Sequence, residues 1–243
     1  MIGFITDKGN VRELNEDNLA YYVGKEISVY VVGDGMGGHN AGEVASKMAV
    51  EGVVSYVNTH YGKLSLEKML KNAVLEVNSD IYAYSKENEG LSGMGTTIVA
   101  IFEYSNKIQI ANVGDSCCYG INKDGIKKLT KDHSLVQELV DSGCITSEEA
   151  KNHPRKNIIT RAIGTNSDVE VDIVTVLKEE YEYYLLCTDG FANDLDEQDI
   201  WKELNSSKDL IKSCENLVEL VKSRGGRDNI TVLVFGGESE YDR

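Results

Sequence analysis

Five aspartates lie where predicted strands begin or end, so side chains from distant segments could meet in one crevice. Asp34 follows an apolar run and is surrounded by glycines, which let the backbone turn and let a ligand approach the main chain. The pattern recurs at Asp115 and Asp189, while Asp17 and Asp228 stand just before predicted strands. A buried carboxylate is costly unless a cation or hydrogen bonds compensate it.

If these five carboxylates meet, cations must cancel their mutual repulsion. All-oxygen ligands, with no Cys/His pair at zinc spacing nearby, suit hard ions such as Mg²⁺ or Mn²⁺. The alternative is that each aspartate only supplies hydrogen bonds to a turn, and for any single aspartate we favour that interpretation. For five of them beside glycine-rich turns, we favour the metal site.

The glycine-rich loop has a competing interpretation. Gly33, Gly35 and Gly38 fit the spacing of a dinucleotide-binding fingerprint, and Glu51 lies at a suitable distance. However, Asp34 would place a negative charge in the turn that must bind a pyrophosphate. The helix that follows is also succeeded by a second helix and not by the parallel strand that a βαβ unit requires. We therefore reject this interpretation.

The elements that position these residues are predicted from hydrophobic periodicity and turn signals. Strands are expected at residues 2–6, 18–23, 27–32, 96–104, 107–113, 117–122, 126–129, 169–177, 183–187 and 230–235. Helices are expected from residue 41 to about 56 and at 66–84, 135–140 and 210–221, with a short one after the capping box of Thr146 and Glu149. Strand clusters alternate with helix pairs, which favours antiparallel sheets covered by helices over a doubly wound parallel sheet.

Composition limits the class of protein. The chain has 243 residues, 41% of them hydrophobic, and a net charge of −15, which argues against nucleic acid as a partner. No apolar run approaches the roughly 20 residues of a membrane span, and the N-terminus lacks a signal pattern. The five cysteines form no CxxC pair and no even framework, so we expect free thiols in a reducing, cytoplasmic compartment.

Short motifs follow one another in order along almost the whole chain. They are Thr6-Asp7-Lys8-Gly9, Asn15-Glu16-Asp17, Asp34-Gly35-Met36-Gly37-Gly38-His39, Gly95-Thr96-Thr97, Asn112-Val113-Gly114-Asp115-Ser116, Asp132-His133-Ser134, Thr160-Arg161-Ala162-Ile163-Gly164, Cys187-Thr188-Asp189-Gly190 and Gly226-Arg227-Asp228-Asn229. This ordered set resembles the type 2C, metal-dependent family of protein serine/threonine phosphatases in its bacterial stand-alone form. The resemblance implies an α+β fold, an αββα four-layer sandwich of two antiparallel sheets flanked by antiparallel helix pairs.

The resemblance also implies two metal sites that share a ligand. Asp34, Asp189 and Asp228 match the ligands of a first metal. Asp17, Asp34 and the backbone carbonyl of Gly35 match those of a second, so Asp34 would bridge the two ions.

Two further positions match functional residues of the family. Asp115, with Asp189, matches the place of a third, looser metal in bacterial relatives. Arg12 matches the phosphate-binding arginine, and its planar fork suits a bidentate grip on a phosphoryl group. The alternative for Arg12 is a surface ion pair with Glu13 or Glu16.

The implied reaction is hydrolysis by a water that bridges two Mn²⁺ or Mg²⁺ ions, without a side-chain nucleophile. Many eukaryotic relatives carry a histidine two positions after the bridging aspartate, as an acid for the leaving oxygen. That position is Met36 here, which cannot donate a proton. His39 or a metal-bound water could take over this role, although a hydrogen bond that orders the loop is the interpretation we favour for His39. His133 is expected to be structural, near the start of a helix.

The resemblance assigns residues 1–236 to one catalytic domain, residues 142–159 to a variable flap that selects substrates, and residues 237–243 to a short polar tail. The leading hypothesis is a monomeric phosphatase of phosphorylated proteins, which opposes a serine/threonine kinase of the same cell and includes it among its substrates. The alternatives are a non-catalytic phosphoprotein-binding version of the fold and a hydrolase of small phosphate esters.

Overall fold

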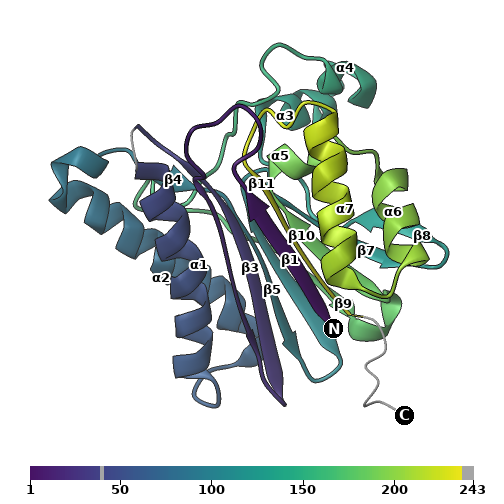
Figure 1. The fold of residues 1–243 in the computed structure, drawn as a ribbon. Coiled ribbons are helices and arrows are strands. Elements are labelled where there is room, and N and C mark those ends of the chain that lie inside the picture. The colour runs from purple at the N-terminus through teal and green to yellow at the C-terminus, as the bar shows by residue number, and fades with distance from the viewer. Residues whose placement is uncertain (39–40, 237–243) are drawn as a thin grey trace.

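The computed structural model describes residues 1–38 and 41–236, and two antiparallel sheets form its centre (Figure 1). The first sheet has the strand order β1 (Ile2–Asp7), β11 (Ile230–Gly236), β10 (Tyr183–Cys187), β7 (Cys117–Asn122), β8 (Gly125–Lys128). The second has the order β2 (Asp17–Val23), β3 (Ile27–Met36), β5 (Ile98–Tyr104), β6 (Lys107–Val113), β9 (Asp172–Leu177). The two-residue strand β4 (Gly95–Thr96) pairs with the end of β3.

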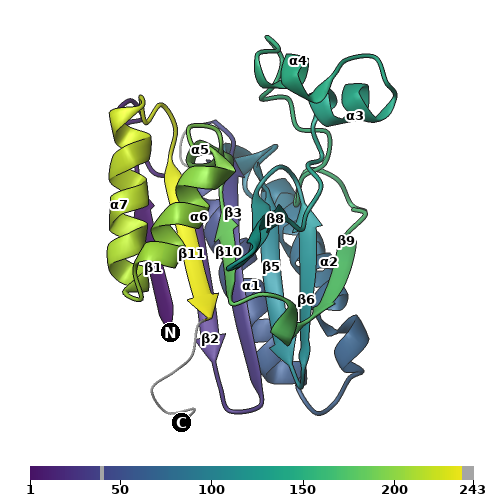
Figure 2. The ribbon, with the colours of Figure 1, turned by 90° about the vertical axis from the view of Figure 1, so that its right-hand side faces the viewer.

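Each sheet has a helix pair on its outer face, which confirms the predicted four-layer α+β sandwich (Figure 1). The long helices α1 (Ala41–His60) and α2 (Leu66–Glu87) cover the second sheet, and α6 (Glu197–Ser206) and α7 (Leu210–Ser223) cover the first. The remaining helices are α3 (Leu135–Asp141), α4 (Ser147–Lys151), α5 (Asp189–Ala192), η1 (Glu89–Leu91) and η2 (Lys178–Glu180). Helices α3 and α4 project beyond one end of the two sheets, and α5 lies at the same end (Figure 2).

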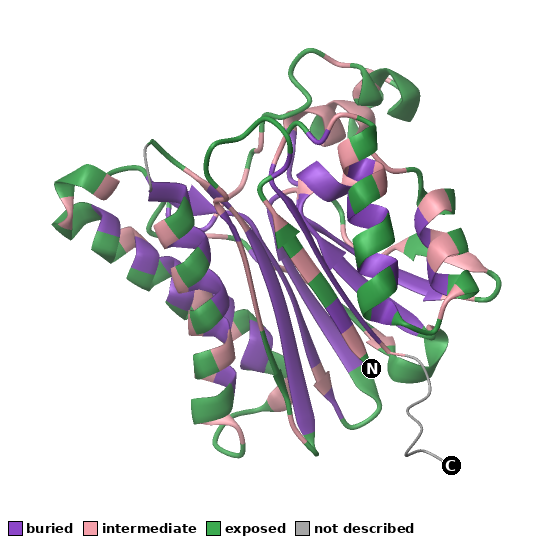
Figure 3. Cartoon of the chain, in the orientation of Figure 1, coloured by how far each residue is buried: buried purple, intermediate pink, exposed green. Residues whose placement is uncertain are grey.

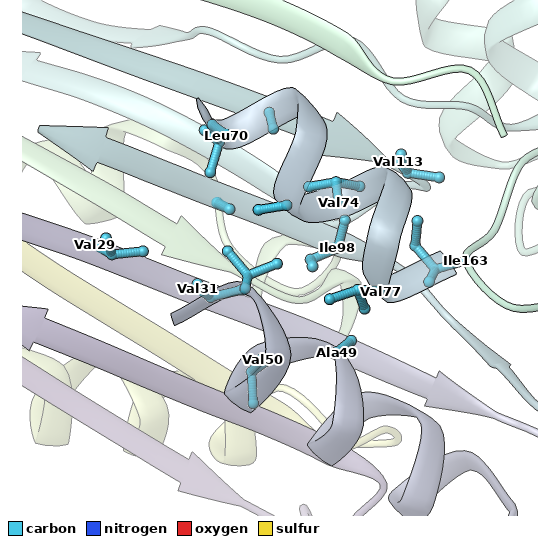
Figure 4. Packing of buried hydrophobic residues seen from close by; sticks show 14 of the residues in the cluster. Val29, Val31, Ala49, Val50, Leu70, Val74, Val77, Ile98, Val113 and Ile163 are labelled. Carbon is cyan, nitrogen blue, oxygen red and sulfur yellow. The ribbon is translucent and has the colours of Figure 1, made fainter. Parts of the chain in front are cut away.

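The apolar run of β3 is continuous because both faces of this strand are covered. Val29 and Val31 pack beneath α1 and α2 (Figure 4), whereas Tyr30 and Val32 point into the layer between the sheets. There the ring of Tyr30 stacks on Phe235 of β11, with centroids 3.7 Å apart. The inner strands of both sheets are accordingly buried along most of their length. The edge strands β1, β2, β8 and β9 are only partly buried, and the helices expose their outer faces (Figure 3).

The structure corrects the predicted end of β3. The strand was expected to end at residue 32, but it continues to Met36 because β4 pairs with its last residues. Side chains alternate along a strand, so Asp34 follows Tyr30 and Val32 on the face between the sheets. The aspartate is therefore a strand residue at the rim of the inter-sheet layer and not a turn residue beyond it.

One predicted helix start is confirmed, and one helix was not predicted. The capping box at Thr146 is confirmed, since its hydroxyl accepts from the Glu149 amide and the Glu149 carboxylate accepts from the Thr146 amide. Helix α6 was not predicted, because only a few apolar residues, including Ile200, Trp201 and Leu204, mark its buried side. Within the two described ranges, no helix combines the length and apolar character needed to cross a bilayer.

Candidate metal centre

Two carboxylates stand opposite each other on neighbouring strands. Asp17 begins β2, and the strand register pairs it directly with Asp34 of β3. Like charges that face each other across an antiparallel pair destabilise a sheet. This pairing is therefore unfavourable unless something of opposite charge lies between or beside the two groups.

Asp17 is the most deeply enclosed of these carboxylates, with 4% of its surface exposed. One oxygen, Oδ2, accepts a hydrogen bond of 2.9 Å from the hydroxyl of Thr188, just before Asp189. The other oxygen, Oδ1, is buried without a hydrogen-bond partner. Buried carboxylate oxygens normally have a partner, so Oδ1 is free to ligate a cation.

Asp189 brings a carboxylate from the other sheet. It opens α5 directly after β10, and its charge raises the pKa of Asp34 on β3. The side-chain amide of Asn193, one turn later, donates to Asp189 Oδ2 at 3.1 Å and orients the Asp189 carboxylate. The charges of Asp17 and Asp189 both raise the pKa of Asp34, so the three carboxylates share one electrostatic environment across the gap between the two sheets.

Burial dominates the electrostatics of this cluster. Burial, together with the charges of Asp189 and Asp228 and against hydrogen bonds that lower it, raises the pKa of Asp17 to about 7. It also raises the pKa of Asp34 well above its ordinary value, with the Asp17 carboxylate as the next cause. Burial likewise raises the pKa of Asp115 to about 7, aided by the charge of Asp189. Without a compensating cation, the protonated form of some of these carboxyl groups is favoured over the fully ionised cluster.

The backbone of Asp34 is fixed by two threonines at the start of the neighbouring strand. The amide of Asp34 donates to the Thr97 hydroxyl at 3.0 Å, and its carbonyl accepts from the Thr97 amide and the Thr96 hydroxyl. Thr97 Oγ1 also lies 2.7 Å from Ser116 Oγ, beside Asp115. These bonds connect the backbone at Asp34 to the turn that carries Asp115.

Arg12 lies on the loop between β1 and β2 and reaches the rim of the cluster. Its Nη2 lies 2.8 Å from Oδ2 of Asp228, and about half of the Arg12 side chain is exposed. The alternative prediction, a surface ion pair with Glu13 or Glu16, is wrong, because the Arg12 guanidinium pairs with Asp228. The other oxygen of Asp228 accepts from the amide of Asn229 at 2.9 Å.

Close backbone packing explains the glycines around Asp34. A Cβ on Gly35 would lie 2.1 Å from the carbonyl oxygen of Gly42, and a Cβ on Gly42 would lie 2.4 Å from Oε1 of Glu16. The N-terminus of α1 therefore sits directly against the end of β3. Glu16 contributes its carbonyl as well, which accepts from the amide of Gly35 and the hydroxyl of Ser46.

The carboxylates meet in pairs and do not yet form a complete coordination shell. In residues 1–38 and 41–236, no three His, Cys, Asp or Glu side chains stand together as a finished metal site. The cluster nevertheless fits a hard cation, because Asp17 offers a partnerless oxygen and Asp34 faces it with raised proton affinity. Its donors are all oxygen, as Mg²⁺ and Mn²⁺ prefer.

The comparisons with known proteins show which family the chain belongs to. The family model described as protein phosphatase 2C matches residues 9–228, which include all five aspartates and Arg12. The chain belongs to the protein phosphatase 2C family. A serine/threonine phosphatase, stp, of Listeria innocua is 41% identical over 235 residues, covering 95% of this chain and 93% of that protein.

Solved structures of this phosphatase family resemble the fold closely. The serine/threonine phosphatase Stp1 from Staphylococcus aureus superposes with a TM-score of 0.89 at 35% identity, covering 98% of this chain and 95% of that one. The catalytic domain of the phosphatase PstP, solved with two manganese ions, gives a TM-score of 0.83 at 34% identity, covering 96% of each chain.

A pocket of about 230 Å³ reaches Met36, two residues after Asp34. Met36, Ile159 and Arg161 are among the residues that line it, together with part of the segment 162–170. Met36 therefore faces this pocket, which borders the C-terminal end of the predicted flap. His39 lies outside the described residues, as does the predicted tail 237–243.

Three supporting residues were not singled out from the sequence. Thr188 orients Asp17, Thr97 connects Asp34 to Ser116, and Glu16 holds the start of β2 against α1 and β3. Each stands within or next to a recognised motif, which was the only available signal. Their partners are 171, 63 and 30 residues away in the chain, so these contacts required the fold.

Proposed function

We propose that this protein hydrolyses phosphoserine and phosphothreonine esters of proteins with the help of divalent cations held by its strand-end aspartates. The observation that carries the proposal is the direct pairing of Asp17 with Asp34, together with the partnerless oxygen of Asp17. Membership of a phosphatase family supports it, as do relatives named serine/threonine phosphatases.

Two cations would share Asp34. Asp34, Asp189 and Asp228 would hold the first, and Asp17, Asp34 and the backbone carbonyl of Gly35 would hold the second. The register of Asp34 with Asp17 supports the bridging role, as does the charge of Asp189, which raises the pKa of Asp34. The manganese ions in the PstP structure favour Mn²⁺, and Mg²⁺ suits the same oxygen ligands.

When bound, such a pair of cations lowers the pKa of a water and neutralises charge on a phosphoryl group. The chain's own residues orient the substrate. Arg12 presents a half-exposed guanidinium at the rim, where Asp228 holds one of its nitrogens and other N–H groups are available for phosphoryl oxygens. The Thr188 hydroxyl donates to Oδ2 of Asp17, which leaves Oδ1 of Asp17 without a hydrogen-bond partner. Cys117 and Cys187 belong to the core beneath α6 and α7 and take no part in the reaction.

We assign a third, looser cation to Asp115 with Asp189. Burial and the charge of Asp189 raise the pKa of Asp115 to about 7, which supports a shared electrostatic environment. For the acid that protonates the leaving oxygen, His39 remains the candidate, because the Met36 thioether carries no transferable proton. Replacement of His39 with Gln tests this role through the leaving-group dependence of kcat.

The substrates we propose are phosphorylated proteins, including a serine/threonine kinase of the same cell. Residues 1–236 would act as one catalytic domain and as a monomer, with residues 142–159 selecting substrates. The projection of α4 beyond the sheets supports contact of this segment with a bound protein (Figure 2). Five free cysteines support a reducing cytoplasmic location.

The test is hydrolysis of a phosphothreonine peptide with and without Mn²⁺. We expect activity that disappears in excess chelator and falls at least about a hundredfold in Asp189→Asn, since electrostatic groups of this kind contribute several kcal/mol. The matched control is Asp124→Asn on the exposed turn between β7 and β8, which should behave as wild type. Full activity in chelator would contradict the proposal.

A further inference from the structure

His133 contacts the turn that carries Asp115 from two sides. Its ring nitrogen Nδ1 accepts a buried hydrogen bond of 3.0 Å from the amide of Gly114. Its own backbone amide donates to the carbonyl of Gly114 at 2.9 Å. One residue therefore binds both backbone polar groups of Gly114, the residue immediately before Asp115.

The turn has little freedom to use another arrangement. Gly114 has φ near +110°, a region that side-chain-bearing residues rarely adopt, and a Cβ there would lie 2.6 Å from Cβ of Thr97. The direction of the Asp115 side chain follows from this backbone. The hydrogen bonds of His133 consequently act on where the Asp115 carboxylate points.

The rest of the histidine is enclosed and anchored. His133 is 7% exposed, and its Nε2 lies 3.3 Å from Oδ2 of Asp172 on β9. Because Nδ1 accepts from Gly114, the neutral ring must carry its proton on Nε2, which then donates to Asp172. Arg161, 3.1 Å from the same nitrogen, is held by Asp172 at 2.7 Å and packs beside the ring without donating to it. The carbonyl of His133 accepts from the amide of Thr160, so the residue is fixed from every side.

We propose that His133 is a positioning residue, which holds the Gly114–Asp115 turn so that the Asp115 carboxylate is aimed at its cation. The proposal rests on the role proposed above for Asp115. It goes beyond the structural role expected for His133 from the sequence, because it assigns the effect to one atom, Nδ1, and to one target.

Two substitutions separate that atom from the rest of the ring. In His133→Asn an oxygen occupies the δ position and can still accept from Gly114, whereas the contact with Asp172 is lost. In His133→Gln the amide is moved to the ε position, so the contact with Asp172 is retained and the acceptor for Gly114 is lost. His60→Gln, at the C-terminal end of α1, is the matched control for a histidine remote from this turn.

The first measurement is hydrogen exchange of residues 112–118 in metal-free protein, and the second is Mn²⁺ binding by calorimetry. In His133→Gln we expect faster exchange at this turn and about tenfold weaker binding of the loosest Mn²⁺, which corresponds to about 1.4 kcal/mol. We expect His133→Asn and His60→Gln to stay close to wild type in both. In an Asp115→Asn background, His133→Gln should cause no further change in Mn²⁺ binding.

Three results would overturn the proposal. Unchanged exchange in His133→Gln would show that Nδ1 does not hold the turn. Equal damage in His133→Asn and His133→Gln would show a role in general stability, which the thermal midpoints of both variants would also reveal. Wild-type Mn²⁺ binding by Asp115→Asn would remove the cation role of Asp115 itself, a failure of the proposed function that the exchange data distinguish from the other two.

Discussion

Replacement of Asp17 with Asn should make the metal-free protein more stable at pH 8 and weaken its stabilisation by metal. In the folded protein, burial raises the Asp17 pKa to about 7 from an ordinary value of 3.8. The folded state thus binds this proton more tightly than the unfolded chain does. Stability is lost as pH rises from about 4 to about 7, because the unfolded chain releases the proton first.

The magnitude follows from that difference. The gap between 3.8 and about 7 corresponds to about 4 kcal/mol at 1.36 kcal/mol for each pH unit. Neighbouring carboxylates share the repulsion, so we expect Asp17→Asn to recover about 2–4 kcal/mol at pH 8 and almost nothing near pH 4. For a chain of 243 residues this is a rise in thermal midpoint of about 5–15 °C. The Asn oxygen can still accept from Thr188.

The assay is thermal unfolding of both proteins in chelator at several pH values, then with Mn²⁺ added. Wild type should be stabilised by Mn²⁺ most strongly at pH 8, where its carboxylates are otherwise uncompensated. Asp17→Asn should start from a higher midpoint and gain little. A variant that is less stable than wild type at pH 8 in chelator would refute the electrostatic reasoning.

Three further predictions concern the surroundings of the site. Arg12→Lys should raise KM for a phosphopeptide about tenfold or more, because a point charge replaces the bidentate fork; an unchanged KM would exclude a phosphate contact. Phe235→Ala should cost about 3–5 kcal/mol in urea unfolding, since it removes a ring stacked on Tyr30, while folded enzyme keeps its kcat; a cost below 1 kcal/mol would contradict the packing. Cys187 lies in the core with its sulfur 3.6 Å from that of Cys117, so Cys187→Ala should retain kcat; loss of turnover in well-folded protein would show that a thiol takes part in the reaction.

The layered fold was predictable because its signals are local. The continuous apolar run of β3 and the helical spacing of α1 and α2 reflect burial on one or both faces, which a short stretch of sequence records. The end of β3 was not predictable, because β4, whose pairing extends it, lies about 60 residues further along the chain. Helix α6 was missed because its buried side carries few apolar residues.

The site, like the fold, was predictable only in part. The aspartates could be listed from their positions at predicted strand ends and from family motifs. Their pairing could not, since the register of Asp17 with Asp34 and the effect of the Asp189 charge on Asp34 depend on how the strands and sheets are placed. The partner of Arg12 was mistaken for the same reason, because Asp228 is 216 residues away.

The central claim is that aspartates from both sheets hold cations that Asp34 bridges. The most direct test is to count tightly bound Mn²⁺ per chain and measure phosphothreonine hydrolysis on the same samples of wild type and Asp34→Asn. We expect two tightly bound ions for wild type, loss of tight binding at both sites in the variant, and a parallel loss of turnover. Full Mn²⁺ binding and turnover by Asp34→Asn would contradict it.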